Sequence, residues 1–277
     1  MERVINIIPY FLNRLKGCAT NNEIRNWAYL SIEHVLDLNR SDCILQSDLK
    51  LSKDVINKFV FIVDDLIQSV PIQHILGEVK FYGLTLKVNS NALIPRPETE
   101  ELVDWALKDE FNSVLDIGTG TGCISIALAL NTKASVIAID VSKEAIELAK
   151  FNALQNQVNI DFLHKDIFLM EDIPVVDLII SNPPYVLDSE KKSMKKNVLN
   201  YDPHISLFVP NNDPLLFYDK ISDLAISNLP SNGKLYFEIN EKFGSDICLM
   251  LDKKGFVDIE LKNDVNNKQR MIKSVKK

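Results

Sequence analysis

The segment Asn182-Pro183-Pro184-Tyr185 carries residue types suited to chemistry on a planar nitrogen. In an amide or an exocyclic base amine the lone pair is delocalised, so the NH2 must be held with that lone pair aimed at the electrophile. The Asn182 side-chain oxygen and the Pro183 carbonyl can accept the two hydrogens. The prolines stiffen the loop, and Tyr185 offers a flat face that excludes water. A Pro-Pro turn with a packing tyrosine is the structural alternative.

A glycine-rich turn lies upstream, with the sequence Asp116-Ile117-Gly118-Thr119-Gly120-Thr121-Gly122. Glycines there let the backbone bend sharply and let a ligand approach the main chain. The dinucleotide fingerprint would place its third glycine at Cys123, one residue later than this sequence does. Asp140 ends the next strand-like run, where a carboxylate can accept both hydroxyls of a ribose. The spacing favours S-adenosylmethionine over a nicotinamide cofactor, and a structural turn with a surface aspartate is the alternative.

Both motifs lie in a region where strand-like and helix-like runs alternate, which predicts a mostly parallel sheet with right-handed crossovers. Ser142 is a candidate N-cap for one of the helices. Two final strand-like runs are joined by a segment too short for a crossover helix, so we expect an antiparallel C-terminal hairpin. The expected strands are 114–117, 135–139, 160–163, 175–180, 234–239, 255–261 and 270–275.

The chain before this region has a different pattern of apolar residues. Apolar residues in helical spacing predict helices over about residues 23–38 and after Ser52. A segment at 81–88 is typical of a hairpin or bent strand pair. We therefore expect a small helical domain at 1–70, a β-hairpin linker at 71–96 and an α/β domain at 97–277. No heptad seam is present, so we expect a monomer.

Composition excludes several classes of protein. The 277 residues include 31 Lys and Arg against 38 Asp and Glu, a formal net charge of −7, which argues against a protein that neutralises nucleic-acid phosphates. No run reaches the roughly 18 apolar residues of a membrane span, and we expect no secretory leader. Four dispersed cysteines without a Cys-x-x-Cys pair predict a reducing cytoplasm, and the four histidines form no metal pattern.

Taken together, these motifs resemble the class I S-adenosylmethionine-dependent methyltransferases that act on planar nitrogens. The segment Leu93-Ile94-Pro95-Arg96-Pro97-Glu98-Thr99-Glu100 narrows the resemblance to the peptide chain release factor glutamine methyltransferases. The run Pro71 to Gly77, followed by Phe81-Tyr82-Gly83, is similar to that family's linker. The resemblance covers essentially the whole chain and is weakest over residues 1–70. It implies a Rossmann-like class I methyltransferase sheet with an antiparallel C-terminal strand, plus the small N-terminal helical domain.

The activity that the resemblance implies is methyl transfer from S-adenosyl-L-methionine, with S-adenosyl-L-homocysteine as product and no metal. The acceptor is the side-chain amide nitrogen of the glutamine in the Gly-Gly-Gln loop of class-I release factors. The implied cofactor residues are Gly118, Thr119, Gly120, Thr121 and Gly122 for methionine, Asp140 for ribose, Asp166 and Ile167 for adenine, and Asn182. The implied catalytic and substrate residues are Asn182, Pro183, Pro184 and Tyr185, with Arg96 and Glu98 as a wall of the substrate mouth.

Three positions depart from the family pattern. Ile167 stands where an aromatic residue is common, Tyr201-Asp202-Pro203 replaces the usual Glu-Pro, and Asn240 replaces the glycine of Glu-Ile-Gly.

Two other segments have a purely structural interpretation. For Arg96 and Glu98 it is a helix N-terminus with Pro97 in its first turn. The basic run Lys191–Lys196 is typical of a solvated, mobile loop, or it contacts negative charge on a partner or on ribosomal RNA.

Three rival functions are weaker on sequence grounds. Methyltransferases for exocyclic amines of nucleic-acid bases carry similar tetrapeptides, but they should bring a basic groove and a target-recognition region. A catalytically silent module that binds a release factor would not need the intact segments 118–122 and 182–185. A nicotinamide-dependent oxidoreductase does not fit the glycine spacing. We expect no stable nucleic-acid partner and no membrane association.

Overall fold

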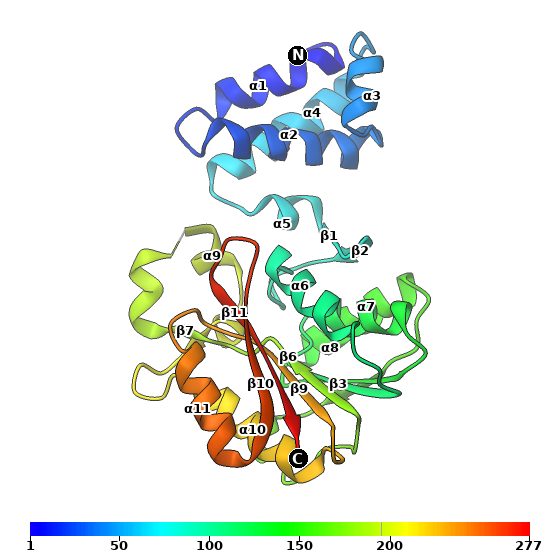
Figure 1. Cartoon of the computed structure of the whole chain (residues 1–277). Helices are drawn as coiled ribbons and strands as arrows, with labels where there is room; N and C mark the ends of the chain where they lie inside the picture. Colours follow the sequence, from blue (N-terminus) through cyan, green and yellow to red (C-terminus); the bar gives the residue numbers. More distant parts are fainter. Residues whose placement is uncertain (195) are drawn as a thin grey trace. The chain divides into compact units, whose positions relative to one another are not determined.

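A computed structural model describes residues 1–194 and 196–277 (Figure 1). These residues form two compact units. The smaller contains residues 1–77 and α9 (Lys196–Tyr201), and the larger contains residues 78–194 and 202–277. The β-hairpin that we expect to link the domains is β1 (Glu78–Phe81) with β2 (Leu84–Lys87), and it groups with the larger unit.

The smaller unit is helical, as the sequence predicts. Thr20 caps α2 in a reciprocal box with Glu23, and Ser52 caps α4 by accepting a hydrogen bond from Val55 N at 3.3 Å. The rings of Phe11 and Phe59 meet edge to face in its core. Its helices are η1 (Val4–Asn6), α1 (Ile7–Arg14), α2 (Asn21–Leu36), α3 (Arg40–Leu45), α4 (Lys53–Ile67) and α5 (Ile72–Leu76), besides α9.

Within residues 78–194 and 202–277, seven strands form one sheet in the order β10-β11-β9-β6-β3-β4-β5. The pairs β3–β4, β3–β6, β4–β5 and β6–β9 are parallel, whereas β11 runs antiparallel to both β9 and β10. The predicted α/β fold and antiparallel C-terminal hairpin are therefore confirmed. The strands are β3 (Ser113–Ile117), β4 (Ser135–Asp140), β5 (Asp161–His164), β6 (Leu178–Ser181), β9 (Lys234–Glu238), β10 (Phe256–Asn263) and β11 (Gln269–Lys276).

Helices cover both faces of this sheet (Figure 1). Alternate strand residues face opposite ways, so Val114 packs with residues of α6, α7 and α8, while Leu115 packs with residues of α10 and α11. These helices are α6 (Pro97–Ala106), α7 (Cys123–Asn131), α8 (Lys143–Gln155), α10 (Leu216–Asn228) and α11 (Gly244–Lys254). The smaller elements of this unit are η2 (Ile167–Leu169), β7 (Val186–Leu187), η3 (Asp188–Ser193), η4 (His204–Ser206) and β8 (Phe208–Val209).

The expected strand over residues 175–180 begins too early. Strand β6 starts only at Leu178, because the chain before it makes other contacts. The Asp177 carboxylate accepts the backbone N–H groups of Asn112 and Ser113, and the Val175 side chain is 73% exposed. Residues 175–177 therefore precede the strand without regular secondary structure; Val176 is buried in the core, whereas Val175 belongs to the pattern by type alone.

The basic run after the tetrapeptide is not an extended loop where the structure describes it. Residues Asp188–Ser193 form η3, and α9 begins at Lys196. Lys191 pairs with Asp188 at 2.6 Å and lies 4.2 Å from the centre of the Phe208 ring. Lys195 lies outside the described residues. Part of this run is therefore helical, while its mobility and its contact with negative charge on a partner stay predictions.

The described residues contain neither a membrane-spanning helix nor a candidate metal cluster. Across 1–194 and 196–277, no helix is long and apolar enough to cross a membrane. The same residues contain no group of three or more His, Cys, Asp or Glu side chains that could hold a metal ion.

Candidate active site

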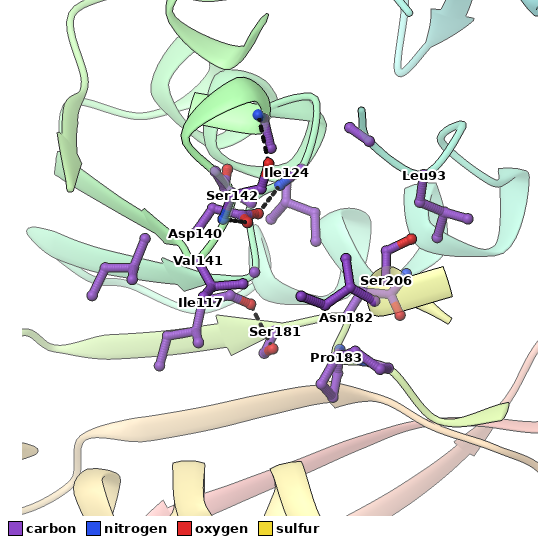
Figure 2. A pocket seen from close by; sticks show the side chains of 18 of the residues that line it. Leu93, Ile117, Ile124, Asp140, Val141, Ser142, Ser181, Asn182, Pro183 and Ser206 are labelled. Carbon is purple, nitrogen blue, oxygen red and sulfur yellow. Dashed lines mark hydrogen bonds between the residues drawn. The ribbon is translucent and has the colours of Figure 1, made fainter. Parts of the chain in front are cut away.

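A cavity of about 220 Å³ opens at the carboxyl ends of β3, β4 and β6, all within the larger unit (Figure 2). Parallel strands bring their carboxyl ends to the same edge, which is where an open α/β sheet binds its ligands. Residues from both sequence motifs line this cavity, although they lie more than sixty positions apart in the chain, at Gly118 and at Asn182 for example. Strand pairing brings them together, since Ile117 of β3 lies directly opposite Ser181 of β6.

The glycine turn connects β3 to α7 through three residues with left-handed backbone. The φ angles of Gly118, Gly120 and Gly122 are 78°, 55° and 81°, a region that other L-residues avoid. A Cβ on Gly118 would meet no atom within 4 Å, and one on Gly120 would meet only Ala92, at 3.9 Å. The absent side chains of these two glycines thus leave open space beside the main chain.

Gly122 has a different role. A Cβ there would lie 3.0 Å from Ile126 Cδ1 and 3.2 Å from the Ala149 Cβ, so this glycine lets α7 and α8 pack closely. Gly122 is not among the residues that line the cavity, whereas the other predicted members of the turn, Gly118 to Thr121, are. A ligand contact at Gly122 stays a prediction.

Asp140 ends β4 beside the turn (Figure 2). Its Oδ2 accepts the backbone N–H of Gly120 at 2.8 Å, and its Oδ1 accepts that of Ser142 at 2.9 Å. Each carboxylate oxygen can accept more than one hydrogen bond, so both keep capacity for a ligand hydroxyl. Burial raises the pKa of this carboxyl, while the backbone N–H groups of Ser142 and Gly120 favour its charged form.

A second carboxyl lies behind the turn. Asp116 is fully buried on β3, and its Oδ2 accepts the hydroxyl of Thr119 at 2.6 Å. Burial raises the pKa of Asp116 to about 7, although the Thr119 and Ser125 hydroxyls stabilise its charged form. This side chain therefore stabilises the turn through its hydrogen bond with Thr119.

Asp166 and Ile167, at the start of η2, also line the cavity, and the residue before them, Lys165, donates its backbone N–H to the Asp140 carbonyl at 3.0 Å. Ile167 is buried, and Phe168 and Phe217 line the cavity next to it. The two phenylalanine rings meet at 5.1 Å between centroids. An aromatic surface therefore adjoins Ile167, the position where the family often has an aromatic residue. The sequence analysis did not single out either phenylalanine.

The tetrapeptide follows β6, and its first three residues line the cavity (Figure 2). The Asn182 Nδ2 donates to Thr99 Oγ1 at 3.2 Å. The Thr99 hydroxyl donates in turn to Glu238 Oε2 at 2.6 Å, and both of these residues are buried. Asn182 is thus connected to side chains on α6 and at the end of β9.

Tyr185 points away from the cavity. Its hydroxyl donates to Glu238 Oε1 at 3.0 Å, and its ring packs against the core beneath α10 and α11. Burial raises the pKa of the Tyr185 hydroxyl and also that of the Glu238 carboxyl. Tyr185 is not among the residues that line the cavity, so its contact with a substrate stays a prediction.

Arg96 lines the cavity and Glu98 does not. The Arg96 guanidinium pairs with Asp202 at 2.6 Å, and the Asp202 side chain is 1% exposed. The shorter acid of Asp202-Pro203 thus reaches the arginine. The structural interpretation of this segment as a helix N-terminus also holds, since Pro97 begins α6 and Glu98 lies in its first turn.

Sequence reasoning missed two residues of this site, Thr99 and Glu238, as partners of Asn182. Thr99 lies in the family-like segment 93–100 and Glu238 lies two residues before Asn240, but nothing in their spacing predicts that they meet. The only sequence signal was the position of Glu238 at the end of a strand, at the same edge of the sheet as Asn182.

Comparisons with known proteins cover both parts of the chain. A model described as a methyltransferase domain matches residues 108–275, and one described as a PrmC N-terminal domain matches residues 9–77. A solved methyltransferase from Pyrococcus furiosus superposes with a TM-score of 0.53 at 20% identity. That likeness covers 70% of this chain and 89% of the other, and it supports the class I methyltransferase fold.

Two full-length relatives carry the same curated name. The release factor glutamine methyltransferase of Flavobacterium psychrophilum is 46% identical over an alignment of 277 positions, which covers 97% of this chain and 97% of the relative. That of Bacteroides thetaiotaomicron is 36% identical over 271 residues, covering 96% of this chain and 98% of the relative. At this identity and coverage, with both domain models in the matching order, the chain belongs to the release factor glutamine methyltransferase family.

Proposed function

We propose that this enzyme transfers a methyl group from S-adenosyl-L-methionine to the side-chain amide nitrogen of the glutamine in the Gly-Gly-Gln loop of class-I release factors. Membership of the family supports the reaction and the substrate class. The structural observation that carries the proposal is the position of Asn182 in the same cavity as the glycine turn and Asp140. One end of that cavity suits a nucleoside cofactor and the other suits an amide.

The cofactor end fits S-adenosylmethionine. Gly118 and Gly120 leave open space beside the backbone where the methionine part would lie. Asp140 keeps acceptor capacity on both oxygens, which suits the two ribose hydroxyls. Asp166 and Ile167 would contact the adenine, with the phenylalanine pair beside them. When bound, this cofactor supplies a methyl group on a positively charged sulfur.

The amide end orients the acceptor. The Asn182 Oδ1 and the Pro183 carbonyl would each accept one N–H of the glutamine amide, which turns its lone pair toward the methyl group. Pro183 and Pro184 limit the backbone freedom of this loop, so the two acceptors are placed before the substrate arrives. Methylation leaves an acidic N–H on the amide cation, and its proton can pass to water without a protein base.

The outer parts of the molecule have proposed roles as well. Residues 1–70 would contact the release factor beyond its glutamine, and the segment 71–96 would link them to the catalytic domain at 97–277. Arg96, held by Asp202, would form a wall of the substrate mouth together with Glu98. We expect a cytoplasmic monomer that needs no metal and no nucleic acid.

A methyl-transfer assay tests the proposal directly. The protein is mixed with labelled S-adenosylmethionine and a recombinant class-I release factor, beside a copy in which the loop glutamine is alanine. We expect label only on the factor with glutamine, mapped to that residue by fragmentation. Label on both copies would place the methyl group elsewhere on the factor. Label on neither, with cofactor binding intact, would overturn the release-factor assignment and favour a nucleic-acid base or a silent binding module.

A further inference from the structure

Asn182 can present either end of its amide to a neighbour, and the two ends do opposite things. The amide oxygen accepts hydrogen bonds, while the NH2 group donates them. In the proposed reaction the glutamine amide also donates, so it needs the oxygen of Asn182. An Asn182 with its NH2 group turned toward the substrate would place donor against donor. The rotamer of this side chain therefore matters as much as its identity.

Thr99 and Glu238 determine which end of the amide faces the cavity. Glu238, as a carboxylate, has no hydrogen to give, so the Thr99 hydroxyl donates its single hydrogen to it, across 2.6 Å. The Thr99 oxygen is then left as an acceptor toward Asn182. It receives the Asn182 Nδ2 at 3.2 Å, which leaves the Oδ1 for the other side.

The carboxylate itself is held from two directions. Its other oxygen accepts the Tyr185 hydroxyl at 3.0 Å, and the residue is 1% exposed. Glu238 also ends β9, which pairs with β6, the strand that precedes Asn182. The two hydroxyls thus hold both oxygens of the carboxylate in place as acceptors, one of them toward Thr99.

We propose that Thr99 and Glu238 are positioning residues that orient the Asn182 amide by a one-way chain of hydrogen bonds, with its oxygen toward the substrate. The consequence for catalysis rests on the proposed function, whereas the orientation itself does not. Thr99 lines the cavity and Glu238 does not, and the proposed role of both is to act through Asn182. The hydroxyl of Thr99, rather than its volume, is the part that this role requires.

The test compares Thr99→Val with Thr99→Ser in the full-length protein. Valine keeps the shape of threonine without the hydroxyl, and serine keeps the hydroxyl with less volume. For Thr99→Val we expect kcat on a release factor to fall about tenfold or more, the size of one lost hydrogen bond in the transition state. The KM for the factor and the Kd for S-adenosylmethionine should stay within about threefold of the parent. Thr99→Ser should keep kcat within about threefold.

A second readout does not depend on activity. The side-chain amide resonances of Asn182 are assigned in a ¹H–¹⁵N NMR spectrum by their loss in Asn182→Asp. We expect Thr99→Val to shift these resonances and Thr99→Ser to leave them near their parent positions. Unshifted resonances in Thr99→Val, or equal kcat values for the two variants, would overturn the proposal. A parent that fails to methylate the factor would instead overturn the proposed function, with the NMR result still deciding the orientation.

Discussion

The cofactor end of the cavity and the amide end are built in different ways. The glycine turn is one strand–turn–helix unit, and its shape depends on backbone angles, on residues close in sequence such as Asp116 and Thr119, and on Asp140 of the neighbouring strand. Asn182 depends on Thr99 and Glu238, which are 83 positions before it and on another strand after it. The difference teaches that the proposed cofactor-binding backbone is encoded mostly within one strand–turn–helix unit and the strand after it, whereas the rotamer of the proposed catalytic side chain needs partners from distant parts of the chain.

The largest effect that separates the two ends is expected in stability. Burial raises the pKa of Asp116 from 3.8 to about 7, so between these values the folded chain holds a proton that the unfolded chain has lost. The free energy of unfolding of the parent should therefore fall as pH rises through that window, by on the order of 4 kcal/mol in total. Asp116→Asn has no such proton and should lack this decrease.

Urea unfolding at about pH 5 and about pH 8 measures roughly 2.7 kcal/mol of this decrease, because pH 5 already lies inside the window. Asp161→Asn, at an exposed position on β5, is the matched control and should behave as the parent does. Parallel pH profiles for the parent and Asp116→Asn would mean that the turn does not rest on a buried neutral carboxyl.

At the amide end the main effect should be kinetic. Asn182→Ala removes one of the two acceptors that orient the substrate, and we expect kcat to fall about 10²–10³-fold, as for loss of a preorganised hydrogen-bonding group. The Kd for S-adenosylmethionine, measured by calorimetry, should rise by no more than about threefold, because Asn182 is only one of several cofactor contacts that the resemblance implies. Asn228→Ala, on α10 outside the cavity lining, is the control. A large loss of cofactor affinity in Asn182→Ala would blur the distinction between the two ends.

The cofactor end should show the reverse pattern. Asp140→Ala removes a charged acceptor, whose hydrogen bonds contribute about 1.5–3 kcal/mol, so the Kd for S-adenosylmethionine should rise about 10–100-fold. At saturating cofactor kcat should change little, because the amide end is intact. Calorimetry and saturation kinetics on the same preparation test both halves. An unchanged Kd would remove Asp140 from the cofactor site.

The smallest effect concerns a departure from the family pattern. The Asn240 Nδ2 donates to the Tyr185 carbonyl at 3.0 Å and to Glu190 Oε2 at 3.3 Å, contacts that the glycine usual at this position cannot make. Asn240→Gly should lower the free energy of unfolding by about 1 kcal/mol and kcat by no more than about threefold. Thermal unfolding and the methyl-transfer assay measure the two. A much larger fall in kcat would show that the two hydrogen bonds of Asn240 also position the amide end.

Much of the fold could be predicted because its signals are local. The caps at Ser52 and Ser142, the alternation of strands and helices and the short C-terminal connection all predicted elements that the structure contains. The start of β6 could not be predicted, because Val175 is apolar in type but exposed in place. The contacts of Asp177 with Asn112 and Ser113 exclude that segment from the strand, and they cross 64 or 65 positions of sequence.

The sequence by itself determined the two motifs, their order, the class of sheet and the family that they resemble. Those properties follow from residue type and from spacing within a few turns of chain, which a linear pattern records. Only the tertiary structure decided that Tyr185 points to Glu238 and that Gly122 serves helix packing. The same is true of the contact through which Thr99 holds Asn182. Side-chain direction and rotamer depend on neighbours brought together by strand pairing, and those neighbours have no fixed spacing in sequence.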